Sequence, residues 1–231
     1  MTLNEIVTNR NNKVTVDLSD YQINTHFLKQ SSYTNIIIDQ INRERIYDKF
    51  FDKSKVLTVL DIGANVGLFS LYAQDEKNKV YALEPTPTHF ELLKKITAPY
   101  KTVKPFNIAL SPIDGEITFY LSDENSTMNS INNKYGKAIN VNGVRLDTFI
   151  KENKIKNIDF IKLDIEGSEM LALTEEIIGN VKDVVKVWFI EAHATTSDNR
   201  TIEDNRNILI QRFGNVGVTL EKYRNDGLIS K

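Results

Sequence analysis

Short apolar runs that alternate with stretches of helical spacing constrain the fold of this chain more than any other feature. VLTVLDIG (56–63) is a continuous apolar run that ends in Asp and Gly, and VGLFSLYAQ (66–74) follows with helical spacing. VYALE (80–84) is the next run, and Thr86-Pro87 after it is typical of a helix start. Runs that are apolar throughout are typical of strands buried on both faces, as in a parallel sheet covered by helices.

The alternation continues to the end of the chain with one interruption. Further strands are predicted at 103–110, 158–167 and 184–193, and further helices at 147–153 (with Asp147 as its cap), 168–180 (ending at Gly179–Asn180) and 201–215. Two strands without a helix between them, 115–122 and 138–146, indicate a small antiparallel insertion, and 216–231 reads as a closing hairpin. We therefore expect a doubly wound α/β fold with right-handed crossovers.

The chain is expected to form one domain over residues 55–231, preceded by an extension over residues 1–54. Its 231 residues are enough for roughly one to one and a half domains. Within the extension, TNIIIDQINRERIYDKFF (34–51) places isoleucines and aromatic residues near helical spacing. This predicts one or two amphipathic helices that pack on the domain. A part in covering the acceptor site is the alternative.

Charge and composition disfavour several classes of function. The chain has 31 acidic and 29 basic side chains, whereas proteins that bind nucleic acid broadly have a basic surplus or patch. Cysteine is absent, which excludes disulfides, Cys-ligated zinc and thiol nucleophiles and agrees with a cytoplasmic location. The sequence shows neither a signal-peptide pattern at its start nor an apolar stretch of about 18 residues, so we expect no membrane span.

A glycine turn follows the first predicted strand, in the pattern Asp61-x-Gly63-x-Asn65-x-Gly67. It lacks the third glycine of the G-x-G-x-x-G motif that binds the pyrophosphate of a dinucleotide. An acid beside the turn suits a cationic ligand with a polar tail better than a pyrophosphate. S-adenosylmethionine (SAM) has a sulfonium, an amino-acid tail and no phosphate, so it fits this pattern. A tight turn without a ligand is the other interpretation.

Polar residues also end the second and third predicted strands. The carboxylate of Glu84 could accept hydrogen bonds from both hydroxyls of a ribose. Asn107 could contact the ribose or the adenine, or it could form an ordinary turn. Turn and acid together predict an adenosyl ligand but separate SAM from NAD only in part.

The fourth and fifth predicted strands end in Asp164 and Glu166, and in Glu191 and His193. If these strands are neighbours, the side chains converge at one edge of the sheet, and three interpretations stay open. His193 or Asp164 is a general base for an acceptor hydroxyl. Alternatively, Asp164, Glu191 and His193 hold a divalent metal ion. In the third, the residues are structural, and the acids bond backbone amides at a helix start.

Five segments occur in the order and spacing of the FkbM family of SAM-dependent methyltransferases, which the chain resembles over residues 55–195. They are VLDIGANVGLFSLYA, VYALEPTPTHFELLKKI, FNIALS with GEITFY, VRLDTFI with IDFIKLDIEGSEMLAL, and FIEAH. The segment IDFIKLDIEGSE is the most specific, because most SAM-dependent methyltransferases share the glycine turn. The resemblance implies a Rossmann-like sheet of seven strands, mostly parallel with an antiparallel last strand. It also implies O-methylation of a sugar, a glycolipid or a polyketide-like hydroxyl.

The site residues follow from the patterns and the resemblance together. Cofactor contacts are predicted for Asp61, Gly63, Asn65, Gly67, Glu84, Asn107 and Asp164. Catalytic roles are predicted for His193, Asp164 and Glu191. Acceptor contacts are predicted for Glu166 and, in a small polar loop after Phe119, for Ser126 and Thr127. The expected cofactor is SAM, with no metal assigned, and the expected partner is a small-molecule or glycan acceptor rather than nucleic acid. A nicotinamide-dependent oxidoreductase and a non-catalytic scaffold of this fold are the alternatives.

Overall fold

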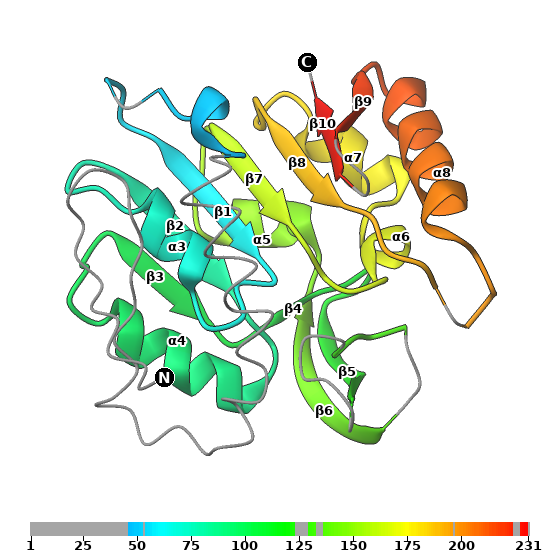
Figure 1. Ribbon diagram of the computed structural model, residues 1–231, viewed down its shortest axis with the longest axis horizontal. Coiled ribbons are helices and arrows are strands. Elements are labelled where there is room, and N and C mark those ends of the chain that lie inside the picture. Colours follow the sequence, from blue (N-terminus) through cyan, green and yellow to red (C-terminus); the bar gives the residue numbers. More distant parts are fainter. Residues whose placement is uncertain are drawn as a thin grey trace, which may run out of the picture.

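The computed structural model describes residues 46–52, 54–122, 129–132, 136–195, 197–223 and 227–230. In this part of the chain, a seven-stranded sheet carries helices on both faces, and a small second sheet lies at one end (Figure 1). The large sheet has the strand order β3-β2-β1-β7-β8-β10-β9. Its strands are β1 (Thr58–Ile62), β2 (Lys79–Leu83), β3 (Val103–Phe106), β7 (Phe160–Leu163), β8 (Trp188–Glu191), β9 (Leu220–Tyr223) and β10 (Gly227–Ser230).

The direction of the strands confirms the predicted Rossmann-like sheet. β1 lies between β2 and β7 and is parallel to both, and the pairs β2–β3 and β7–β8 are parallel as well. β10 is inserted between β8 and β9 and runs antiparallel to both. The strand order reverses at β1, since the chain first builds outward to β3 and then returns to β7 on the other side. Ligands of such sheets bind beyond the carboxyl ends of the strands at this switch point.

Neighbouring residues of a strand point to opposite faces of the sheet, so a hydrophobic core forms on each face. Val59 of β1 belongs to the core under the helices α3 and α4, whereas the next residue, Leu60, belongs to the core under α5, α7 and α8. The helices are η1 (Asp48–Phe50, a 3-10 helix), α3 (Leu68–Ala73), α4 (Pro87–Thr97), α5 (Leu146–Glu152), α6 (Glu169–Ala172), α7 (Glu175–Val181) and α8 (Ile202–Asn215).

The small sheet contains β4 (Ala109–Leu110), β5 (Gly115–Leu121) and β6 (Lys137–Val144). β5 and β6 pair in antiparallel fashion, as expected for the insertion, and β4 adds to β6 in parallel. The single strand predicted over 103–110 is therefore divided between the two sheets. Figure 1 shows the small sheet at the end toward which β1, β7 and β8 point, which is the ligand-binding end of the fold.

Two helix predictions were wrong in detail. The helix predicted over 168–180 is two helices, α6 and α7, because the side chain of Thr174 accepts a hydrogen bond from the backbone of Ile177 and starts a new helix. Gly179 and Asn180 consequently lie inside α7. Asp147 does not cap α5 but lies in its first turn, where its carboxylate accepts hydrogen bonds from the side chain of Arg145.

Of the predicted N-terminal extension, the structure describes residues 46–52 and 54. Ile46, Tyr47 and Phe51 are buried in the core under α3 and α4, so this segment packs on the sheet. The helices predicted upstream of residue 46 lie outside the described residues. No helix in the described part of the chain is both long enough and apolar enough to cross a membrane.

Candidate functional site

The glycine turn between β1 and α3 brings the end of β1 into close contact with the end of β7. Gly63 and Gly67 have φ values of 78° and 92°, and Asn65 between them also has a positive φ, 51°. A Cβ atom on Gly63 would lie only 1.8 Å from the backbone oxygen of Asp164. Glycine is therefore required at position 63 both for the backbone conformation and for the close approach of the two strand ends.

Asp61 is fully buried beneath this turn. Its Oδ2 accepts a hydrogen bond from the hydroxyl of Ser70 at 2.5 Å. Its Oδ1 is buried and has no hydrogen-bond partner among the described residues. Burial raises the pKa of Asp61 to about 6, although the ammonium group of Lys162 opposes the shift. Buried polar atoms are rarely left without a partner in native proteins, so this oxygen is available to accept a hydrogen bond from a ligand.

Glu84, directly after β2, ties the turn to the neighbouring strand. Its carboxylate accepts hydrogen bonds from the backbone amides of Asn65 and Thr86, both at 2.8 Å. Burial raises its pKa. The side chain of Asn107 donates to the backbone oxygens of Glu84 and Pro85 at 2.8 and 3.0 Å. A carboxylate has about four lone-pair sites, so Glu84 can also accept from a ligand hydroxyl.

The ammonium group of Lys162 lies between the end of β1 and the end of β7 and contacts both. Lys162 Nζ lies 2.8 Å from Asp164 Oδ2 and 3.5 Å from the backbone oxygen of Gly63. Burial alone would lower the pKa of Lys162, but the carboxylates of Asp164 and Asp61 raise it above its ordinary value. Lys162 thus supplies positive charge between two buried acids, which keeps both of them close together.

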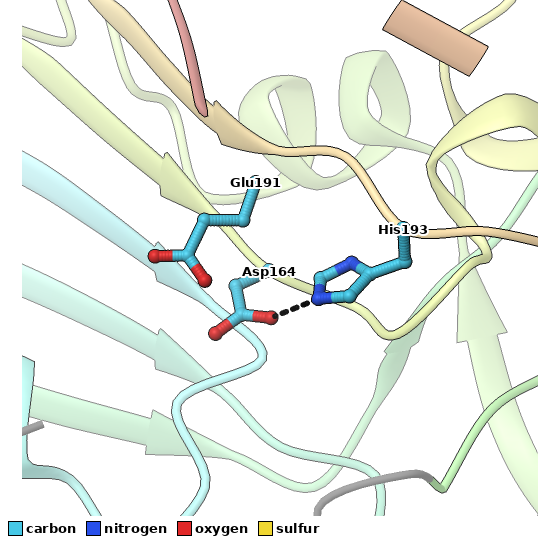
Figure 2. A group of neighbouring side chains, drawn as sticks. All are labelled: Asp164, Glu191 and His193. Atoms are coloured by element: carbon cyan, nitrogen blue, oxygen red, sulfur yellow. Dashed lines mark ion pairs between the residues drawn. The ribbon is translucent and has the colours of Figure 1, made fainter. Parts of the chain in front are cut away.

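His193, two residues beyond β8, is surrounded by carboxylates. Its Nδ1 lies 2.8 Å from Glu169 Oε1, and its Nε2 lies 3.6 Å from Asp164 Oδ1 and 3.7 Å from Glu166 Oε2. Figure 2 shows the ring edge of His193 turned toward Asp164, with Glu191 on the neighbouring strand beside them. Burial alone would lower the pKa of His193, but the carboxylates raise it well above its ordinary value.

Glu166 completes the group around His193. It adopts the left-handed conformation (φ 53°), which is uncommon for glutamate, and Gly167 after it also has a positive φ. Burial raises the pKa of Glu166 to about 8, an effect that His193 opposes and the neighbouring acids increase. The site therefore combines a buried acidic turn on one side with a histidine among acids on the other.

Comparison with known proteins identifies the family. The profile of the methyltransferase FkbM domain matches residues 61–218, which is more than half of the chain and includes every site residue described so far. The chain belongs to the FkbM methyltransferase family. Its seven-stranded sheet is the Rossmann-like fold of SAM-dependent methyltransferases.

The relatives are distant. Methyltransferase 1 of Beauveria bassiana is 24% identical over 161 residues, which cover 58% of this chain and 65% of the relative. Methyltransferase sdnD of Sordaria araneosa is 27% identical over 172 residues, which cover 56% of this chain and 66% of the relative. The chain thus spans about two thirds of the length of the curated relatives it matches.

A solved structure supports the fold. The Staphylococcus aureus protein provisionally described as a caffeoyl-CoA O-methyltransferase aligns with a TM-score of 0.53 and 12% identity over 92% of this chain and 93% of that chain. At this identity, the likeness concerns the fold and not the acceptor.

The structure brings most of the predicted site residues of this FkbM-family chain to one end of the sheet. Asp61 lies near the end of β1, and Glu84 and Asp164 directly follow the adjacent strands β2 and β7. Glu191 is the last residue of β8 beside them, and His193 lies two residues beyond it. Ser126 and Thr127 lie outside the described residues, so their predicted contact with the acceptor stays a prediction.

Two residues of the cluster, Lys162 and Glu169, were missed by sequence reasoning. Lys162 carried a signal, since it is a lone charge inside an otherwise apolar strand. Glu169 carried none, because an acid at a helix start is common.

The residues present fit SAM better than a metal ion. Asp164, Glu191 and His193 offer ligand atoms that all lie within 4.8 Å of one another. However, the ammonium group of Lys162 lies 2.8 Å from Asp164 Oδ2 and already neutralises that carboxylate in part. We therefore assign no metal. The unpartnered Oδ1 of Asp61 beside the glycine turn is, by contrast, what a cationic amino-acid tail requires.

Proposed function

We propose that this protein transfers the methyl group of SAM to a hydroxyl oxygen of a small molecule, with a sugar, a glycolipid or a polyketide-like molecule as the acceptor class. The observation that carries the proposal is the position of the two half-sites. The acidic glycine turn, with the unpartnered oxygen of Asp61, lies directly against Asp164, which also lies 3.6 Å from His193. The proposed cofactor subsite and the proposed base are thus adjacent.

On the cofactor side, the residues around the glycine turn provide the contacts. The Asp61 carboxylate and the turn at Gly63, Asn65 and Gly67 hold the methionine tail, and Glu84 accepts hydrogen bonds from the ribose. Asn107, which fixes the backbone of Glu84, adjoins the same ligand, as does Asp164. When bound, SAM supplies a methyl group already activated by positively charged sulfur, so the protein mainly has to align the reacting atoms.

On the acceptor side, His193 is the proposed base, with Asp164 and Glu191 beside it and Glu166 in contact with the acceptor. The acceptor oxygen forms a bond to the methyl carbon as the bond from carbon to sulfur breaks, and His193 Nε2 takes the hydroxyl proton. The ring of His193 must be neutral for this step, so a protonated ring first releases its Nε2 proton to solvent. A positive charge brought into the site favours this release, because like charges disfavour each other's ionised forms.

Calorimetric titration of the purified chain tests the cofactor assignment. We expect micromolar binding of SAM and of S-adenosylhomocysteine and no binding of NAD. Glu84→Ala is expected to weaken SAM binding by about 1.5–3 kcal/mol, or roughly 10- to 150-fold, the range for hydrogen bonds to a charged group. Glu91→Ala removes an exposed acid from α4 and serves as the matched control.

Two outcomes would contradict the proposal. Failure to bind either adenosyl ligand would mean that the glycine turn is only a turn, and a scaffold role would replace the enzymatic one. Binding of NAD in preference to SAM would point to an oxidoreductase. If SAM binds, incubation with hydroxylated acceptors and mass analysis of the products tests the O-methylation itself. Methyl transfer to nitrogen or carbon only would refute that part.

A further inference from the structure

We propose that Glu169 is a positioning residue of this site and that its carboxylate holds the imidazole of His193 with Nδ1 turned inward and Nε2 toward the acceptor side. The proposal rests on the proposed function, because the base role of His193 gives this orientation its meaning. Glu169 is the first residue of α6, and only 1% of its surface is exposed. A glutamate this deeply buried needs a partner, and His193 is that partner.

The carboxylate of Glu169 is itself held in place. Its Oε1 accepts hydrogen bonds from the backbone amides of Ile165 and Gly167, both at 3.2 Å, and the same oxygen lies 2.8 Å from His193 Nδ1. Two amides of the turn after β7 thus set the position of the carboxylate before it meets the ring. A carboxylate anchored in this way can orient the imidazole rather than follow it.

The contact with Glu169 also selects the tautomer of the His193 ring. A carboxylate oxygen that faces Nδ1 accepts a hydrogen bond from it, so Nδ1 carries a hydrogen in both the charged and the neutral ring. In the neutral ring, the lone pair is then on Nε2, which faces Asp164 Oδ1 at 3.6 Å and Glu166 Oε2 at 3.7 Å. A base directed at an acceptor beside Asp164 needs this tautomer.

The backbone of His193 is held separately from its ring. Asn205, on α8, donates from Nδ2 to the backbone oxygen of His193 at 2.7 Å and is itself 1% exposed. With the backbone fixed by α8, the ring can move only by rotation about its side-chain bonds. The contact with Glu169 restricts that rotation.

The charged groups that face the ring come from three elements. Glu169 from α6 and Glu166 and Asp164 from the end of β7 act on His193 directly. Lys162 neutralises Asp164 in part, and Glu191 of β8 acts on Glu166. Glu169 makes the largest of the favourable contributions to the charged ring, so the loss of its charge is expected to change the titration of His193 more than any other single substitution.

Nuclear magnetic resonance of the full chain labelled with ¹⁵N-histidine tests the proposal. The chain has three histidines, and His193→Gln identifies the signals of His193 by their loss. Two-bond ¹H–¹⁵N spectra report the charge and tautomer of each ring as a function of pH. We expect His193 to be charged at neutral pH in the unsubstituted chain. In Glu169→Gln, its midpoint should fall by about 1–3 pH units, the effect of losing one close opposite charge.

Glu169→Gln keeps an oxygen for both backbone amides, so a shift of the midpoint reports the lost charge beside the ring and not an altered turn. Glu152→Gln, at the exposed end of α5, removes the same charge far from the ring and should leave the midpoint where it is. An unchanged midpoint in Glu169→Gln would overturn the proposal. If that variant does not fold, a neutral His193 with its hydrogen on Nε2 in the unsubstituted chain would overturn it equally. No SAM is present in this test, so its failure is distinct from a failure to bind SAM.

Discussion

At the scale of single residues, the ionisation of the buried Asp61 is coupled to the stability of the fold. Its side chain is fully buried, and burial raises its pKa from 3.8 to about 6. Lys162 and Asp164 on β7 and Glu84 after β2 are the charged groups that act on it. Because the folded-state pKa is the higher one, the unfolded chain loses this proton first as pH rises. Folding stability contributed by Asp61 is therefore lost between about pH 3.8 and pH 6.

A cationic ligand favours the ionised form of Asp61. The pH dependence of SAM binding therefore tests whether Asp61 holds the ligand. If the ionised Asp61 holds the methionine tail, SAM affinity should rise as pH increases through about 6 and then level off. At pH 5, about one unit below the midpoint, binding should be roughly tenfold weaker than at pH 7.5. Calorimetry with Asp61→Asn should show a flat profile, and Asp75→Asn, an exposed acid before β2, should keep the normal one. A steep profile in Asp61→Asn would exclude this role.

The same scale shows what the sequence could and could not reveal about the site. Asp61, Glu84 and Asp164 were predicted because each follows an apolar run, and the ends of adjacent parallel strands meet at one edge. The contact of Glu169 with His193 joins residues 24 apart in the chain. It depends on how α6 packs beside the end of β8, which no local pattern encodes.

At the scale of elements, local capping decides boundaries that hydrophobic patterns leave open. The apolar residues of 168–180 continue in phase, but Thr174 interrupts them by capping α7. Residues 103–110 were predicted as one strand, but Asn107 bonds the backbone after β2, and the chain then enters the small sheet. Element types were thus predictable from periodicity, whereas these divisions depend on single polar contacts.

α8 illustrates how a cap can support the site. Thr201 forms a capping box with Asp204, and Asn205, one turn into the helix, holds the backbone of His193. Thr201→Ala should lower the free energy of unfolding by about 1 kcal/mol, the usual effect of losing such a cap. Urea denaturation measures this change. Thr118→Ala removes an exposed threonine of β5 that caps nothing and should change stability by about 0.5 kcal/mol or less. An equal loss in both variants would show that the cap contributes nothing specific.

At the scale of the whole molecule, part of the charged cluster lies on the same face of the sheet as one of the two hydrophobic cores. Phe160, Lys162 and Asp164 alternate along β7 and its end, so they share the sheet face that η1 and α3 cover. Tyr47 from the N-terminal segment lies on that face and is 4% exposed. Burial, and next the charge of Glu191, raise the pKa of Tyr47 well above its ordinary value. The segment before β1 therefore forms part of the apolar support beneath the acidic cluster.

Removal of the Tyr47 ring tests whether this segment belongs to the cooperative fold. Its ring centroid lies 4.7 Å from that of Phe69 on α3 and 5.0 Å from that of Phe189 on β8, so it bridges a helix and the sheet. Tyr47→Ala should lower the free energy of unfolding by about 3–5 kcal/mol, as for other buried aromatic rings, whereas Tyr47→Phe keeps the packing and should change it far less. Urea denaturation distinguishes the two. A loss below about 1 kcal/mol in Tyr47→Ala would mean that the segment detaches before the sheet unfolds.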